Sequence, residues 1–188
     1  MSTAAVATGN WAAQASSALA QLSARQRGER PGHAPHRQPI GIIGPSVASD
    51  AQINAARIIA GRIAACGVAL VCGGKGGVMS AAAQGAQEAG GQIIGLLPED
   101  DMSAANPYLT IALPTGIGEM RNALIARSSI CLIAIGGGMG TLSEMALALR
   151  WGKPLFTLYE EVKLPGAYSA SSIEELIAVA VTAVVDVA

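Results

Sequence analysis

Aromatic side chains are scarce in this sequence. Phe, Trp and Tyr together make up only 3% of the 188 residues, although 51% of the chain is hydrophobic. The core must therefore be built from Ala, Val, Ile and Leu, which are the residues that fill parallel sheets covered by helices on both faces. This composition predicts one α/β domain, because 188 residues supply a single substantial core and are too few for two ordinary ones.

Histidine is missing from residues 39–188. The two histidines of the chain, His33 and His36, both lie in the N-terminal segment, where we interpret them as solvated linker residues. Residues 39–188 therefore contain neither a Ser-His-Asp triad nor a histidine-based metal cluster. We predict no metal site, and any acid–base chemistry would fall to a carboxylate.

Cysteine is also rare. Cys66, Cys72 and Cys131 are odd in number, and the last two fall inside or beside apolar runs, where a thiol packs as a small hydrophobic group. We interpret all three as reduced core residues, which suits the cytoplasm.

Neither an excess of charge nor a long apolar run is present. The net charge is −1, which gives no field that would attract nucleic acid or an anionic membrane. No apolar stretch approaches the roughly 20 residues that cross a bilayer. We therefore expect a cytoplasmic protein that binds neither nucleic acid nor membrane.

The first 38 residues differ from the rest in charge. They hold four arginines and one glutamate, whereas residues 39–188 hold eight basic and twelve acidic side chains. A Ser- and Arg-rich segment with so little acid is either an organellar transit peptide or a plain extension. Because Pro31, Gly32 and Pro35 are typical of a linker, we predict a flexible extension over residues 1–38, with one short helix over Trp11–Arg25, and a ligand-binding domain over residues 39–188.

From residue 39 onward the pattern repeats as an apolar run, a glycine turn and an alanine-rich helical segment. It predicts right-handed βαβ crossovers, and hence a Rossmann-like, doubly wound, mostly parallel sheet of about six or seven strands in three layers. The first helix of the domain should begin with Asp50 as its N-cap. The predicted strands occupy residues 39–44, 68–72, 92–97, 109–113, 130–135 and 154–157.

The turn after the second predicted strand has four glycines in five positions. Gly73, Gly74, Gly76 and Gly77 surround Lys75. Glycine lets the backbone adopt positive φ and approach a ligand, and the helix that follows presents free N–H groups, which suits a phosphate. The turn is neither a dinucleotide fingerprint nor a Walker A loop, because the G-x-G-x-x-G spacing is missing and Lys75 is followed by Gly76. Lys75 either contacts the anion or is solvated at the tip of the loop.

A second glycine turn follows the fifth predicted strand, at the same edge of the sheet. Gly137, Gly138, Met139, Gly140 and Thr141 lead from an apolar strand into a helix, so that backbone N–H groups converge there. Glycine turns also occur where a helix packs tightly on a strand, but packing alone does not readily explain two of them at one edge. We therefore predict that both turns bind the phosphate of a small molecule.

Two charged residues accompany the turns. Arg121 lies in the first turn of its helix, directly after Pro114-Thr115-Gly116, and is expected to project from the same edge. Glu144 should not face a phosphate unscreened, since like charges about 4 Å apart repel by on the order of 4 kcal/mol at an effective dielectric near 20. We expect it to bond ligand hydroxyls, to pair with an arginine, or to lie outside the site at the helix N-terminus.

These residues resemble the Lonely Guy superfamily, whose members were long mislabelled as lysine decarboxylases. The similarity covers roughly residues 39–158, and within the superfamily the chain is most similar to molybdenum cofactor carrier proteins. It rests on Gly73-Gly74-Lys75-Gly76-Gly77-Val78-Met79, on Arg121, and on Gly137-Gly138-Met139-Gly140-Thr141-Leu142-Ser143-Glu144.

The resemblance implies one of two functions. As a carrier, the chain would bind molybdenum cofactor and hold its phosphate on the two glycine turns and Arg121. As a Lonely Guy enzyme, it would be a phosphoribohydrolase that releases the base from cytokinin nucleoside monophosphates, with Arg121 and Glu144 as catalytic residues. In either case the resemblance implies a homodimer or homotetramer.

Two departures from the enzyme motif favour the carrier. Gly136 stands where the enzymes usually have proline, and Met120-Arg121-Asn122 replaces their Glu-Arg-Lys run. The carrier is therefore our prediction, the phosphoribohydrolase is the alternative, and a bare nucleotide sensor is a third class. Lysine decarboxylase activity is not expected, since no lysine stands where a pyridoxal Schiff base would form.

Overall fold

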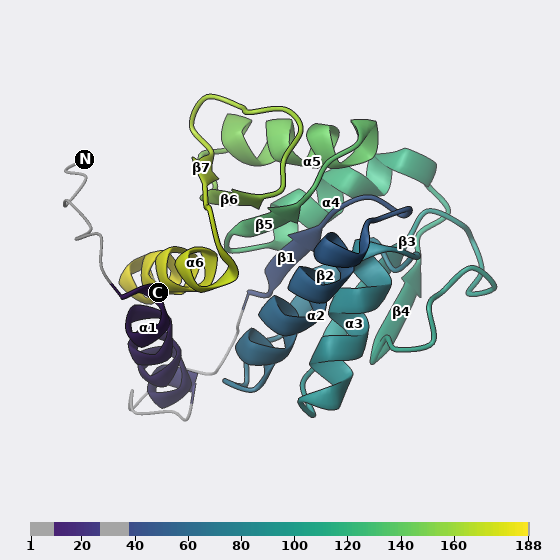
Figure 1. Cartoon of the computed structure of the whole chain (residues 1–188). Coiled ribbons are helices and arrows are strands. Elements are labelled where there is room, and N and C mark those ends of the chain that lie inside the picture. Colours follow the sequence, from purple (N-terminus) through teal and green to yellow (C-terminus); the bar gives the residue numbers. More distant parts are fainter. Residues whose placement is uncertain (1–9, 27–37, 188) are drawn as a thin grey trace.

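The computed structural model describes residues 10–26 and 38–187, which form an α/β fold with a seven-stranded sheet (Figure 1). The strands are β1 (Ile40–Ile43), β2 (Leu70–Cys72), β3 (Ile93–Leu97), β4 (Ile111–Pro114), β5 (Leu132–Ile135), β6 (Leu155–Leu158) and β7 (Tyr168–Ser169). The helices are α1 (Trp11–Gln26), α2 (Asp50–Ala64), α3 (Val78–Glu88), α4 (Arg121–Ser128), α5 (Met139–Arg150) and α6 (Ile173–Val187), with a 3₁₀ turn η1 (Gly118–Met120) before α4. None of the helices in this part of the chain has the length and apolarity needed to cross a membrane.

The sheet is parallel throughout and runs in the order β4-β3-β2-β1-β5-β6-β7. The chain therefore starts at the centre, adds β2 to β4 on one side, and then crosses to add β5 to β7 on the other. In sheets of this kind ligands bind beyond the carboxyl ends of the strands at the point where the order reverses. Here that point lies between β1 and β5. The predicted doubly wound, Rossmann-like sheet is confirmed.

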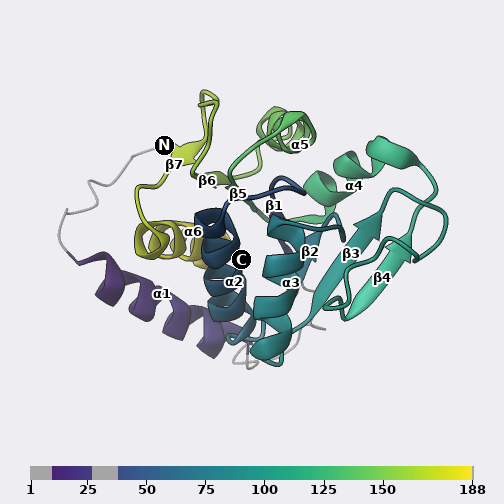
Figure 2. The ribbon, with the colours of Figure 1, turned by 45° about the vertical axis from the view of Figure 1, so that its right-hand side comes forward.

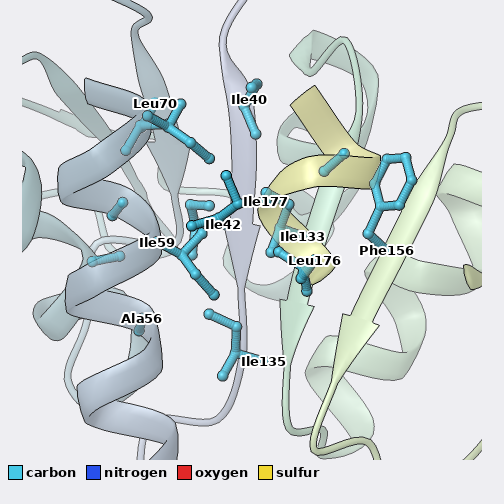
Figure 3. Close-up of a cluster of buried hydrophobic side chains, with 14 of the residues drawn as sticks. Ile40, Ile42, Ala56, Ile59, Leu70, Ile133, Ile135, Phe156, Leu176 and Ile177 are labelled. Atoms are coloured by element: carbon cyan, nitrogen blue, oxygen red, sulfur yellow. The ribbon is translucent and has the colours of Figure 1, made fainter. Parts of the chain in front are cut away.

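Helices cover both faces of the sheet, which makes three layers (Figure 2). α2, α3 and α6 share one apolar cluster with alternate strand residues, and Figure 3 shows Ile42, Ile59, Ile133 and Leu176 pointing toward one another within it. α4 and α5 share a second cluster with the strand residues that point the other way, such as Leu132. This alternation is what a strand buried on both faces requires.

The structure differs from the prediction in several details. The N-cap of α2 is Ser49, not Asp50, because the Ser49 hydroxyl accepts the Gln52 N–H at 3.3 Å while the Gln52 side chain accepts the Ser49 N–H at 2.9 Å. The strand β7 was not predicted, since two residues are too short for any periodicity to appear. The second, fourth and fifth strands begin at Leu70, Ile111 and Leu132, each two residues later than predicted.

The helix expected within the N-terminal extension is present as α1, and it packs against α6 (Figures 1 and 2). Asn10 caps it by accepting the Ala13 N–H at 3.2 Å. Ala15, Ala18 and Leu22 recur at helical spacing and are buried in the same cluster as α6. These side chains attach α1 to the core, so this part of the segment is not a free extension. The rest of the prediction falls on residues 1–9 and 27–37, outside the described residues.

Candidate functional site

A cleft of about 530 Å³ opens at the carboxyl ends of the strands, where the strand order reverses. Loops that follow β1, β2, β3 and β5 border it, together with η1 and the first turn of α4. Its lining consists of Gly44, Pro45, Ser46, Val47, Lys75, Met79, Pro98, Glu99, Glu119, Arg121, Asn122, Gly138, Met139, Gly140, Thr141 and Glu144.

The second glycine turn forms one wall of this cleft. Gly136 leaves β5 with a positive φ of 71°, and Gly138 is the extended N-cap of α5. The first hydrogen bond within the helix runs from the Leu142 N–H to the Gly138 carbonyl at 2.8 Å, so the N–H groups before Leu142 receive no partner from the helix itself. A Cβ added at Gly138 would meet nothing within 4 Å, which leaves open space beside the backbone. Such a helix start can bind an anion.

Arg121 and Glu144 meet inside the cleft. The Arg121 Nη1 donates to Glu144 Oε1 at 3.4 Å, a long contact between two side chains that are 9% and 5% exposed as whole residues. Arg121 Nε is buried and has no hydrogen-bond partner among the described residues. Because Arg121 lines the cleft and its contact with Glu144 is long, its guanidinium can still bind an incoming anion.

Burial shapes the chemistry of Glu144. Loss of water around the carboxyl raises its pKa to about 8, with Arg121 opposing the rise and Glu119 adding to it. At neutral pH this carboxyl is therefore mostly protonated, which leaves the Arg121 charge without a full counter-charge. Of the three placements expected for Glu144, pairing with an arginine is the one present, in this weakened form.

The first glycine turn contributes to the cleft mainly by making room for residues that line it. Only Lys75 of its five residues lines the cleft, and its ammonium forms an ion pair with Glu99. A Cβ at Gly73 would lie 2.5 Å from the Arg121 guanidinium, so glycine at this position makes room for that side chain. Gly77 has a φ of 60°, and a Cβ there would lie 2.3 Å from the Pro45 carbonyl oxygen. Gly74 and Gly76 likewise do not line the cleft.

Gly137 also lies outside the lining of the main cleft. It borders a smaller hollow of about 100 Å³ on the other side of the turn, together with Glu160, Glu161 and Val162 from the segment after β6. Of the twelve residues proposed from the sequence, Lys75, Arg121, Gly138, Met139, Gly140, Thr141 and Glu144 thus share the main cleft.

Several lining residues were not proposed from the sequence. The loop 44–47 follows β1, and its place beside the second glycine turn could have been read from the predicted topology. Asn122 donates to Ser143 Oγ at 3.0 Å and so joins α4 to the start of α5. Glu99 and Glu119 belong to no motif, and only the folded arrangement brings them to the cleft.

Comparison with known proteins gives a family match and similar solved structures. The sequence matches the profile of the SLOG cluster4 family over residues 37–185. The molybdenum cofactor binding protein from the phototrophic bacterium Rippkaea orientalis is 34% identical, with a TM-score of 0.75 over 80% of this chain and 99% of that chain. The molybdenum cofactor carrier protein from Chlamydomonas reinhardtii is 33% identical, with a TM-score of 0.71 over 78% of this chain and 99% of that chain.

A plant enzyme shows a shorter similarity. A cytokinin riboside 5′-monophosphate phosphoribohydrolase from Arabidopsis thaliana is 35% identical over 83 residues, which is 43% of this chain and 36% of the enzyme. The chain therefore matches just over a third of the length of that relative.

Proposed function

The chain belongs to the SLOG cluster4 family of the Lonely Guy superfamily, and from this premise we propose that it is a binding and carrier protein for molybdenum cofactor. The phosphate end of the cofactor would lie against the backbone of Gly138–Thr141, and Arg121 would donate a charge-assisted hydrogen bond to it. In this role the residues of the chain bind, orient and shield the ligand, and they catalyse no step.

The cleft fits a ligand of this kind in size and in charge. Its volume of about 530 Å³ falls within the range of roughly 300–1,000 Å³ that small-molecule sites occupy. Arg121 lines the cleft and makes only a long contact of 3.4 Å to Glu144, so its guanidinium can donate to a phosphate oxygen. The two similar solved structures, both of proteins named for this cofactor, support the same ligand.

The observation that carries the choice of carrier over enzyme is the extent of the similarity. The match spans 99% of the length of two solved proteins named for molybdenum cofactor, but only 36% of the plant enzyme. Gly136 and Met120-Arg121-Asn122 also depart from the enzyme motif. Burial raises the pKa of Glu144 to about 8, and a neutral carboxyl suits a site that holds an anion.

A nucleoside 5′-monophosphate phosphoribohydrolase remains the second candidate, favoured by the similarity to the plant enzyme. In that case Glu144 would have to ionise when substrate binds, and Arg121 would hold the 5′-phosphate. Both candidate ligands end in one phosphate, so the phosphate end of the cleft serves either of them.

Chromatography of the reaction products separates the two functions. A carrier should release no adenine or ribose 5-phosphate from AMP, and no free base from cytokinin riboside monophosphates, and it should slow the decay of added molybdenum cofactor. Turnover on the order of one per second that collapses in Glu144→Gln would establish the enzyme instead.

We further propose that the protein is a homo-oligomer, and that copies associate through the β4–α4 face. This face is defined by the exposed side chains Ile111, Leu113, Ile117, Met120 and Leu124. The first two are in register with Ile94 and Leu96 of β3 on the side of the sheet that carries α4. Ile111 and Leu113 are 44% and 45% exposed on that side of β4, and a helix of a second copy would complete the layer.

A further inference from the structure

We propose that Glu99 recognises the end of the ligand opposite its phosphate. It would do so by accepting hydrogen bonds from the adjacent N–H groups of a 2-amino-4-oxopyrimidine ring. Pterins and guanine share this ring edge, with a ring N–H next to an exocyclic amino group. The inference rests on the proposed phosphate-bearing ligand and adds the chemical class of its other end.

Glu99 presents an acceptor that nothing in the described protein uses. Its Oε1 accepts from the Lys75 ammonium, whereas its Oε2 is shielded from solvent and has no hydrogen-bond partner among the described residues. The hydrogen bond from Lys75 holds the pKa of the carboxyl below its usual value, so the group is ionised. An ionised carboxylate only accepts hydrogen bonds, and the Glu99 side chain lines the cleft with 33% of its surface exposed, so a ligand donor can reach it there.

The backbone holds Glu99 in place at the end of β3. The Gly116 N–H donates to the Glu99 carbonyl at 2.9 Å, and the Gly118 N–H donates to the Pro98 carbonyl at 3.0 Å. Asn106 fixes the partner lysine, because its Nδ2 donates to the Lys75 carbonyl at 3.1 Å and to the Gly74 carbonyl at 3.0 Å. The backbone that carries Glu99 and Lys75 is therefore held in place, and the Lys75 ammonium orients the carboxylate.

The sheet order sets how far Glu99 lies from the phosphate end. Glu99 follows β3 and the second glycine turn follows β5, with β2 and β1 between them. Three strand spacings of about 4.8 Å separate the two, or about 14 Å. That span suits an elongated ligand with its phosphate at one end and a heterocycle at the other, and Arg121 lies between them, against Gly73 at the end of β2.

The carboxylate distinguishes between purines. Guanine turns two donors, N1–H and the 2-amino group, toward an acceptor, and a carboxylate can receive both. Adenine turns the lone pair of N1 in the same direction, which faces the carboxylate with another acceptor and leaves Glu99 unsatisfied. Sites that bond such groups reject analogues that lack them far more strongly than apolar pockets do.

Isothermal titration of the intact protein with GMP, IMP and AMP tests this inference. We expect GMP to bind at least tenfold more tightly than AMP, with IMP, which keeps only the N1–H, between them. Glu99→Gln should weaken GMP at least tenfold, because its amide turns a donor toward the ring, while inorganic phosphate binds within about twofold of the wild type or more tightly. Asp100→Asn, which changes the exposed neighbouring carboxylate, should leave all four affinities unchanged.

Equal binding of GMP and AMP, no binding of GMP, or a Glu99→Gln protein that keeps the preference would each overturn the inference. The binding of inorganic phosphate distinguishes failure of this inference from failure of the proposed function. If phosphate binds and Arg121→Ala abolishes its binding, the anion site stands and only the role of Glu99 is wrong; if phosphate does not bind, both are wrong.

Discussion

Arg121 supplies the buried positive charge of the cleft. Its guanidinium lies against Gly73 and reaches Glu144, yet its Nε has no partner among the described residues. Arg121→Ala should therefore weaken the binding of inorganic phosphate at least tenfold, or about 1.4 kcal/mol. The melting temperature of the ligand-free protein should change little, because Glu144 is mostly protonated at neutral pH and is not left as a buried charge. Titration calorimetry and thermal unfolding measure the two effects.

Arg150→Ala is the matched control for this substitution. Arg150 is exposed at the far end of α5, away from the cleft, and its removal should alter neither phosphate binding nor stability. If Arg121→Ala lowers stability as much as binding, Arg121 supports the fold instead of the ligand.

Glu144 makes stability depend on pH. Its pKa is raised from 4.5 to about 8 in the folded chain, so between these values the folded state holds a proton that the unfolded state has lost. The contribution is full below the unfolded value and is lost as pH rises toward 8. The free energy of unfolding should therefore fall with rising pH in this window, by at most about 1.4 kcal/mol per pH unit.

Urea denaturation of the wild type and of Glu144→Gln, at several values from about pH 5 to pH 9, isolates this contribution. The glutamine keeps a neutral side chain that does not titrate, so the difference between the two proteins should shrink or reverse as pH rises and level off above about pH 8. A difference that stays constant with pH would mean that Glu144 is ionised throughout.

Among the elements, the second glycine turn could be predicted from sequence and the first only in part. Glycines between an apolar strand and a helix reveal an exposed helix start by local pattern alone, and α5 does begin within this turn, at Met139. The first turn looks the same locally, but Gly73 and Gly77 accommodate Arg121 and Pro45, which come from distant parts of the chain. Such contacts have no local signal.

The element whose packing was least expected is α1. Its composition of Ala, Ser and Gln resembles a plain extension, and its apolar stripe has meaning only against α6. Leu22 is 2% exposed in that contact. Leu22→Ala should destabilise the protein by about 2 kcal/mol, measured by urea denaturation, whereas Gln21→Ala on the exposed side of α1 should change stability by less than about 0.5 kcal/mol. Equal and small effects would show that α1 is not part of the cooperative fold.

For the whole molecule, the order of elements was predictable and the surfaces were not. Alternating apolar runs and helices indicated the parallel sheet, because each crossover must return to the same sheet with the same hand. Glu99 was not proposed because one carboxylate in an acidic loop carries no pattern. No sequence pattern indicated that one side of β4 is exposed, since Ile111 and Leu113 are as apolar as any buried strand residues.

The bare β4–α4 face predicts association between copies. Leu113→Lys places a charge at its centre and should shift the protein toward monomer in size-exclusion chromatography with light scattering, with little change in melting temperature, because Leu113 is 45% exposed in the single chain. Val162→Lys, at a similarly exposed site near the opposite edge of the sheet, should leave the mass unchanged. A Leu113→Lys protein of wild-type mass would place the interface elsewhere.

Mass spectrometry of the ligand retained after gentle purification, from cells that make molybdenum cofactor, tests the central claim most directly. The wild type should carry molybdenum cofactor or its pterin in near-stoichiometric amount, and Arg121→Ala should lose it while Arg150→Ala keeps it. A wild-type protein that retains no pterin, and instead carries a nucleoside monophosphate or its hydrolysis products, would contradict the account.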